Sequence, residues 1–217
     1  EECTSIALNS DSVFCAGKTS GSLFEENGGG EDIFVVGLSK VSGEKIWGTQ
    51  IGSVTESSED ASIMAENCNG LVADENFVYC AGYTNGNLGE ASHNKNKDII
   101  LAKLGVSDGA LSFVKQLGSV SELSENTTEQ TQECLDLAMD ESGLYCVGNT
   151  NGNLFGTHAG NGDIFAIKFN FDGQIEWGTQ LGSEVNGTDA RDSCNSIAID
   201  EDVIYCAGYT TGNLGGS

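Results

Sequence analysis

The segment "VIYCAGYTTGNL" (Val203–Leu214) occurs four times in related form, and this repetition decides the fold. The other copies read "SVFCAGKTSGSL" (Ser12–Leu23), "FVYCAGYTNGNL" (Phe77–Leu88) and "GLYCVGNTNGNL" (Gly143–Leu154). Their cysteines lie 65, 66 and 60 residues apart, and a second cysteine precedes each of them by 12 residues. Self-similarity at such a period predicts an array of small structural units.

Each period reads as four short strands joined by turns. In the third period a first strand starts at "CLDLAMD", and the copied segment, rich in Val and Tyr, supplies the second. A Gly/Asn loop leads to "DIFAIKFN" (163–170), and a Gly-containing turn leads to "IEWGTQLG" (175–182). We therefore predict an all-β fold of four-stranded antiparallel β-propeller blades, which must stack to bury their faces. Three aromatic residues at one fourth-strand position should fill the space between blades: Trp47, Phe113 and Trp177.

The repeats give the predicted organisation of residues 1–217. Full repeats are expected at 3–67, 68–133 and 134–193, followed by a partial repeat at 194–217. Three and a half blades do not close a ring, so we expect a segment of a larger propeller or array. The strand Val203–Thr210 would then expose one edge, which we expect to be covered in the native particle by further repeats or by a neighbouring chain.

The recurring strings "DIF", "WGTQxGS" and "GYTxGNL" resemble the repeat of seven-bladed β-propellers known as the SBBP repeat. The resemblance extends over nearly the whole chain. It implies a propeller in an extracellular or surface setting, and it implies no particular chemistry. The cysteine pair in every copy departs from the family pattern and favours a secreted eukaryotic variant.

Composition limits the partners and the compartment. The formal charge of −24 opposes binding to nucleic acid or to anionic lipid, and no apolar stretch is long enough to span a membrane. Eight cysteines in regular positions predict disulfides and an oxidising compartment. The sequons at Asn126 and Asn186 predict N-glycosylation.

Two disulfide patterns are compatible with the spacing. Pairing within repeats gives Cys3–Cys15, Cys68–Cys80, Cys134–Cys146 and Cys194–Cys206. Pairing between repeats gives Cys15–Cys68, Cys80–Cys134 and Cys146–Cys194. We favour the first pattern because the 12-residue spacing never varies. A regular hairpin turning at Glu201–Asp202 would, however, pair Cys206 near Ala198, so the first strand would have to bend to bring Cys194 into reach.

Few residues suggest a ligand or a reaction. Asp32, Asp98 and Asp163 precede the third strands, where they could cap the Gly/Asn loop or bind calcium through hard oxygen ligands. His93 and His158 lie five residues before two of these aspartates. The repeated glutamines Gln50, Gln116 and Gln180 are expected to hydrogen-bond between strands. No catalytic motif is present, so we predict a non-enzymatic protein with no cofactor, with calcium as the candidate metal.

Two functions remain open at this stage. The first is a secreted structural or adhesive component of an extracellular or cell-surface assembly, with other copies or other chains as partners. The alternative is a glycan- or ligand-binding propeller module with one loop site per blade. Neither reading involves nucleic acid or insertion into a membrane.

Overall fold

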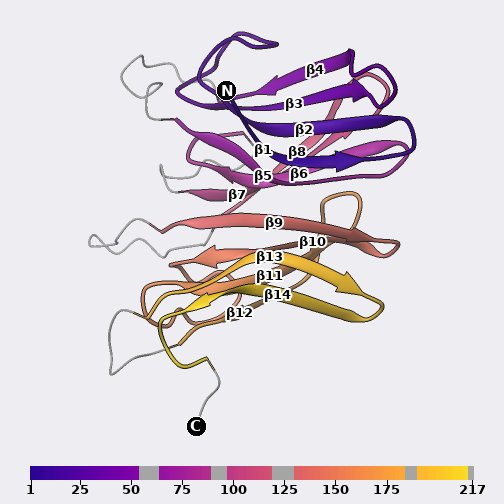
Figure 1. Cartoon of the computed structure of the whole chain (residues 1–217). Coiled ribbons are helices and arrows are strands. Elements are labelled where there is room, and N and C mark those ends of the chain that lie inside the picture. Colours follow the sequence, from indigo (N-terminus) through magenta and orange to yellow (C-terminus); the bar gives the residue numbers. More distant parts are fainter. Residues whose placement is uncertain (54–63, 89–96, 119–129, 184–189, 215–217) are drawn as a thin grey trace. The chain divides into compact units, whose positions relative to one another are not determined.

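The computed structural model describes the whole chain except residues 54–63, 89–96, 119–129, 184–189 and 215–217. All regular elements among the described residues are β-strands, and they pair in four antiparallel sheets (Figure 1). The strand order in each sheet follows the chain. The predicted all-β fold of four-stranded propeller blades is therefore confirmed.

The four sheets have matching strands. The first holds β1 (Glu2–Leu8), β2 (Ser12–Thr19), β3 (Asp32–Ser39) and β4 (Lys45–Ile51). The second holds β5 (Glu66–Ala73), β6 (Phe77–Thr84), β7 (Asp98–Gly105) and β8 (Leu111–Leu117). The third holds β9 (Gln132–Asp140), β10 (Gly143–Thr150), β11 (Asp163–Phe169) and β12 (Ile175–Leu181). The last sheet holds β13 (Asp192–Asp200) and β14 (Val203–Thr210).

The chain divides into two compact units, which we describe separately. Unit 1 comprises residues 1–95 and 99–116, and unit 2 comprises residues 96–98 and 117–217. In unit 1, β5 lies along β1, β2 and β3. In unit 2, β13 lies along β9, β10 and β11 in the same way. Each unit thus contains one junction at which the first strand of one sheet packs on the preceding sheet.

The core of unit 1 joins its two sheets. It includes Phe14, Ile33, Val35 and Trp47 from the first sheet and Leu71, Val78, Ile100 and Leu104 from the second. The Trp47 indole Nε1 donates a hydrogen bond to the Val106 carbonyl oxygen at 2.7 Å, so the β7–β8 hairpin covers this ring. Trp47 is only 7% exposed, as expected for a residue that fills the space between blades. Trp177, at the same position in unit 2, is 39% exposed, so the packing role predicted for it is not fulfilled within the described residues.

A β-bulge recurs in the first strand of every repeat, next to the cysteine. The pairing shifts between Cys3 and Ser5, between Cys68 and Gly70, and between Cys194 and Ser196. The bulge brings each first-strand cysteine opposite a glycine of the second strand, as in Cys194 with Gly208. A Cβ on Gly208 would collide with the Ser193 carbonyl oxygen, which explains why glycine follows the "CA" or "CV" pair in all four copies.

The bulges bring the two cysteines of each repeat within disulfide distance of each other. Four pairs lie at disulfide distance, each within one repeat, with Cα–Cα distances of 6.0, 5.7, 5.9 and 5.7 Å: Cys3–Cys15, Cys68–Cys80, Cys134–Cys146 and Cys194–Cys206. Cys206 is paired in register with Ile197, beside the Ala198 near which it was expected, and the register shifts only beyond this pair, between Ser196 and Cys194. Because the bulge adds a residue to the first strand, that strand bends in the way that the within-repeat pattern required.

Candidate functional site

A clamp formed by one glutamine and one aspartate recurs in the repeats. In the first repeat, the Gln50 side-chain oxygen accepts hydrogen bonds from the backbone N–H groups of Leu23 (2.9 Å) and Phe24 (3.2 Å). Its amide nitrogen donates to the Gly21 carbonyl oxygen at 2.9 Å and to Asp32 Oδ2 at 2.8 Å. The clamp therefore fixes the Gly/Asn loop on the sheet.

The third repeat has the same clamp, and the second repeat shares the bonds from its glutamine to the loop backbone. Gln180 accepts from the Leu154 N–H at 2.9 Å and donates to Asp163 Oδ2 at 2.7 Å. Gln116 accepts from the Leu88 N–H at 3.0 Å. The prediction that these glutamines hydrogen-bond between strands is thus only partly right, because most of their bonds go to loop backbone.

The aspartates belong to this clamp, which bears on the calcium hypothesis. Asp32 Oδ2 also accepts from the Gly28 N–H at 2.9 Å, and Asp163 accepts from the Ala159 N–H at 3.1 Å. This is the capping role considered for these aspartates, shown here for Asp32 and Asp163; Asp98 is buried as they are. No group of three or more acidic, histidine or cysteine side chains that could hold a metal ion occurs among the described residues.

Of the two histidines, only His158 lies among the described residues. His158 Nε2 lies 4.0 Å from Asp163 Oδ1, and the His158 backbone N–H donates to Asn153 Oδ1 at 2.8 Å. His158 therefore belongs to the loop around the clamp. His93 lies outside the described residues, as do the two predicted glycosylation sites, Asn126 and Asn186.

Unit 1 contains a buried carboxylate that the sequence pattern does not predict. Glu66, the first residue of β5, is fully buried and accepts hydrogen bonds from Ser53 Oγ (2.7 Å) and Thr84 Oγ1 (2.9 Å). Loss of hydration raises the pKa of Glu66 to about 7, and the nearby Asp32 charge acts in the same direction. A polar residue always precedes the first cysteine by two positions, and this was the signal available in the sequence: Glu1, Glu66, Gln132 and Asp192.

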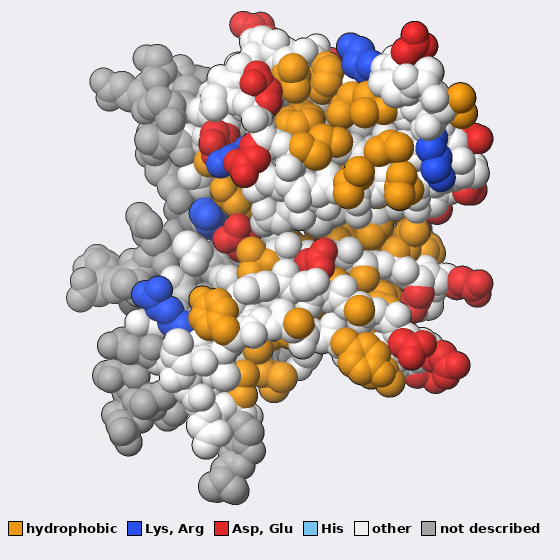
Figure 2. Space-filling model, in the orientation of Figure 1, with side chains coloured by type: hydrophobic (Ala, Val, Ile, Leu, Met, Phe, Trp, Pro, Cys, Tyr) orange, Lys and Arg blue, Asp and Glu red, His pale blue; other side chains and the backbone are white. Residues whose placement is uncertain are grey.

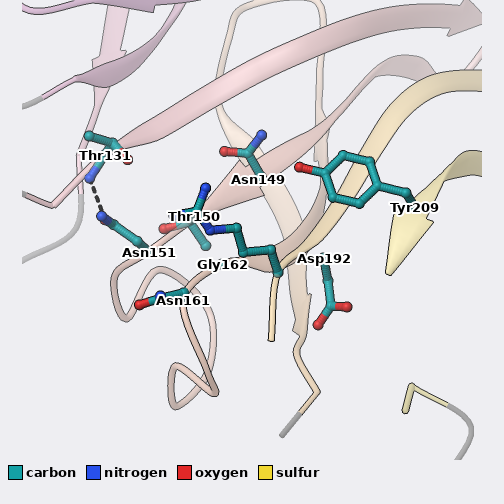
Figure 3. Close-up of a pocket in the computed structure, with 9 residues that line it drawn as sticks. Thr131, Asn149, Thr150, Asn151, Asn161, Gly162, Asp192 and Tyr209 are labelled. Carbon is teal, nitrogen blue, oxygen red and sulfur yellow. Dashed lines mark hydrogen bonds between the residues drawn. The ribbon is translucent and has the colours of Figure 1, made fainter. Parts of the chain in front are cut away.

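The described surface of unit 2 has a polar cavity and an apolar groove. Figure 3 shows the polar cavity. It has a volume of about 280 Å³ and lies at the junction of β13 with the preceding sheet. We call it the Arg191 pocket, and its principal polar lining residues are Asn149, Asn151, Asn161, Arg191, Asp192 and Tyr209. Tyr209 lies on one side of this pocket and Asn151 on the other (Figure 3).

The second hollow in unit 2 is apolar and also has a volume of about 280 Å³. We call it the Trp177 groove, and its lining includes Ile164, Ala166, Trp177, Leu181, Ile204 and Cys206. Hydrophobic side chains also reach the surface over β13 and β14 in the lower part of Figure 2. Ile204 and Cys206 of β14 contribute to the lining of the groove.

Comparison with known proteins supports the propeller-repeat reading. Residues 176–215 match the family model described as "Beta-propeller repeat". This match begins in β12 and includes β13 and β14, so it joins the outer strand of one sheet to the first two strands of the next. It is consistent with a propeller-repeat family, and the resemblance inferred from the sequence is confirmed there.

Comparisons with curated proteins and with solved structures do not identify a family. No curated protein matches the chain. Among solved structures, the chain is similar to BamB from Moraxella catarrhalis, with 8% sequence identity and a TM-score of 0.29. The alignment covers 95% of this chain and 82% of the BamB chain.

Two observations bear on the compartment. The four cysteine pairs at disulfide distance suit an oxidising, extracellular environment, because cytosolic thiols are kept reduced. No helix in the described part of the chain is long and apolar enough to cross a membrane.

Proposed function

Starting from a chain with a β-propeller repeat at residues 176–215, we propose that it is a secreted, non-enzymatic structural protein of an extracellular or cell-surface assembly. Assembly occurs when a β-hairpin is added to the exposed edge of β14. The observation that carries this proposal is the Trp177 groove. The same position in unit 1 is Trp47, which the β7–β8 hairpin covers.

The groove has the shape and chemistry of an unfilled hairpin site. In unit 1, Thr49 Oγ1 donates to the Gly109 carbonyl oxygen at 2.8 Å, next to the bond from Trp47 to Val106. Thr179 and Trp177, at the equivalent positions of unit 2, line the groove instead. Burial of this apolar lining would stabilise a partner at roughly 25 cal/mol per Å² of apolar surface removed from water.

The strand beside the groove, β14, also has an unpaired edge that can accept a partner strand. Within the described residues, β14 pairs only with β13, whereas β10 pairs on both sides. Tyr205 of β14 is 54% exposed, whereas Tyr145, at the same position of β10, is 7% exposed. The free N–H and C=O groups of an apolar edge favour the addition of a strand.

The expected occupant is a two-stranded hairpin of the same repeat type, supplied by further repeats of the same polypeptide or by another chain of the assembly. Its register follows from the existing pairs, in which Thr19 lies opposite Asp32 and Thr150 lies opposite Asp163. The occupant should therefore place the aspartate of its "DIF" motif opposite Thr210. Its second strand should present an aromatic residue and a Thr-Gln pair, as β4 and β12 do.

The compartment assigned in this proposal rests on the disulfides and on charge. Four pairs, each closing a 12-residue separation, suit a protein that must keep its fold outside the cell. The charge of −24 keeps such a chain soluble, so association must depend on a specific apolar surface.

A synthetic peptide with the sequence of residues 163–181 tests the proposal. We expect it to bind the 217-residue chain in isothermal titration calorimetry, while a scrambled peptide does not bind. Ile204→Asp, which places a charge in the groove, should weaken binding more than tenfold. Val41→Asp is the matched control, because Val41 is an exposed turn residue in unit 1.

Three results bear against the proposal. Absence of peptide binding would overturn the hairpin site, and so would equal binding to the Ile204→Asp variant. Circular dichroism of both variants shows whether the fold persists. If Ile204→Asp fails to fold, Leu181→Asp, at an exposed groove position, replaces it in the same measurement.

A further inference from the structure

The Arg191 pocket has a counterpart in unit 1 that an ion pair occupies. There, Lys18 Nζ lies 3.0 Å from Glu31 Oε1, and Glu2 lies 4.0 Å from the same nitrogen. Lys18 stands three residues after the second cysteine of its repeat, and Glu31 directly precedes the clamp aspartate. At this junction, therefore, the Lys18 ammonium group is paired with carboxylates of the same chain.

Unit 2 replaces both members of that ion pair with uncharged residues. Asn149 stands at the position of Lys18, and Gly162 stands at the position of Glu31. Both line the Arg191 pocket. The substitutions remove two charged side chains from the junction, which leaves room for a ligand.

Unit 2 also adds a cation at this place. Arg191 occupies the position that Ala65 holds in unit 1, three residues before a first-strand cysteine. Its backbone is fixed, because its N–H donates to Thr211 Oγ1 at 2.8 Å and it forms a parallel bridge with Gly162. Among the described residues, no ion pair or side-chain hydrogen bond involves its guanidinium group. In a chain with 33 acidic residues, an arginine in a pocket that has no carboxylate partner among the described residues points to an anion from outside.

The one carboxylate of the pocket is already engaged. Asp192 is buried, and its Oδ2 accepts from the Ser183 N–H at 2.7 Å, while Ser183 Oγ donates to Oδ1 at 3.0 Å. These bonds hold Asp192 in the junction between the sheets. Arg191 is thus the charged group of the pocket that remains available to a ligand.

The other lining groups suit hydroxyls and a saturated ring. The Asn149 amide nitrogen donates to Ser193 Oγ at 3.3 Å, and this bond sets the orientation of the amide whose oxygen can accept from a ligand hydroxyl. Tyr209 is about half exposed and forms one wall of the pocket (Figure 3). An aromatic ring beside amides and hydroxyls gives both an apolar surface and hydrogen bonds.

We propose that the Arg191 pocket binds one acidic sugar residue of the hexuronate class. The sugar carboxylate pairs with the Arg191 guanidinium in the two-pronged geometry that arginine favours. The ring hydroxyls bond to the asparagine amides, and the pyranose ring lies against Tyr209. At about 280 Å³, the pocket is at or below the lower end of the range for drug-sized ligands and suits a monosaccharide unit.

This site does not depend on the structural role proposed above, and it differs from one loop site per blade. The ion pair in unit 1 and the pocket in unit 2 show that equivalent positions have diverged. The acidic surface should repel long polyanions, so the ligand is a single uronate unit, free or at the end of a glycan.

Binding of D-glucuronate, followed by NMR shift titration of the 217-residue chain, tests the inference. We expect saturable binding of glucuronate, and binding at least tenfold weaker for its methyl ester and for D-glucose. Arg191→Gln should weaken glucuronate binding at least tenfold, and Arg191→Lys should weaken it to a smaller extent. Lys18→Gln, at the ion pair of unit 1, is the matched control and should leave binding unchanged.

The contrary outcomes are distinct. Equal binding of glucose and glucuronate would overturn the assignment of a carboxylate ligand, and undiminished binding to Arg191→Gln would overturn the role of Arg191. A glucuronate-terminated disaccharide that binds as tightly as free glucuronate assigns the ligand to glycan ends. If Arg191→Gln fails to fold, Arg191→Lys and Tyr209→Ser decide the outcome in the same titration.

Discussion

The junction in unit 1 and the junction in unit 2 have the same strand order, yet they differ in what covers them. β5 lies along the first sheet and β13 lies along the third sheet in the same way. In unit 1 the β7–β8 hairpin then completes the cover over Trp47, but nothing equivalent covers Trp177 within the described residues. Similar sequences thus produce similar strands, whereas burial is decided by the neighbouring sheet.

The comparison separates two kinds of repeated residue. The bulge at each first-strand cysteine and the clamp around Gln50 and Gln180 are complete within one sheet and its loop, so they are the same in both units. Residues at the junction depend on the next sheet, and these are the residues that have diverged. The four predictions below test this division, from the largest expected effect to the smallest.

Trp47→Ala and Trp177→Ala should differ most. Removal of a buried large aromatic side chain costs about 3–5 kcal/mol of unfolding free energy, and Trp47 also loses its bond to Val106. Trp177→Ala should cost about 1 kcal/mol, because the ring is already partly exposed. Urea unfolding followed by circular dichroism, with the disulfides oxidised, measures both. Equal losses would show that Trp177 is covered in solution.

Glu66→Gln should stabilise the protein above neutral pH. The folded-state pKa of about 7 exceeds the ordinary value of 4.5, so the folded chain binds this proton more tightly than the unfolded chain. The unfolding free energy of the native protein therefore falls as the pH rises from about 4.5 to 7, by about 3 kcal/mol in total.

The glutamine variant should remove this dependence and exceed the native stability at pH 8. Gln132 occupies the same position in the third repeat and is equally buried, so the site accepts an amide. Unfolding at pH 4 and at pH 8 measures the effect, with the exposed Glu44→Gln as control. A variant less stable than the native chain at pH 8 would contradict the assignment of an uncompensated buried charge.

Gln50→Leu and Gln180→Leu should cost similar amounts, because the clamp is complete within each sheet. Each change leaves loop N–H groups without an acceptor and removes one hydrogen bond from the clamp aspartate. Loss of hydrogen bonds to partly buried groups costs about 2 kcal/mol. Chemical denaturation of both variants, with Gln174→Leu in an exposed turn as control, checks this expectation. Unequal losses would mean that the clamp depends on the junction after all.

Much of the fold was predictable because its signals are local. The strands β2 (Ser12–Thr19) and β3 (Asp32–Ser39) occupy the segments that alternation and turn residues indicated. β5 begins at Glu66, two residues before the cysteine, because its start bridges to the loop that precedes β3: the Glu66 N–H donates to the Glu31 carbonyl oxygen at 2.8 Å. That contact joins residues of two repeats, and no local pattern reports it.

The candidate sites were less predictable for the same reason. In an acidic chain, Glu66 has the sequence signature of a surface residue, and only the packed sheets show its burial. Arg191 follows an acidic loop and carries no motif. Its significance comes from Asn149 and Gly162, which lie far from it in the third repeat. Asp32 and Asp163 were identified because they recur, and the structure shows them as loop caps.

Lys18→Met should have the smallest effect of the four. The Lys18 pKa is raised, chiefly by the hydrogen bond to Glu31, so the ammonium group is favoured in the folded chain. Both side chains remain about one-third exposed, however, and such pairs contribute less than about 1 kcal/mol. The loss in unfolding free energy should shrink further in 0.5 M NaCl, because salt screens exposed charges. Urea unfolding at low and high salt, with Lys40→Met as control, measures this. A loss that exceeds the loss from Gln50→Leu would show that the junction of unit 1 depends on charge more than on its loop clamp.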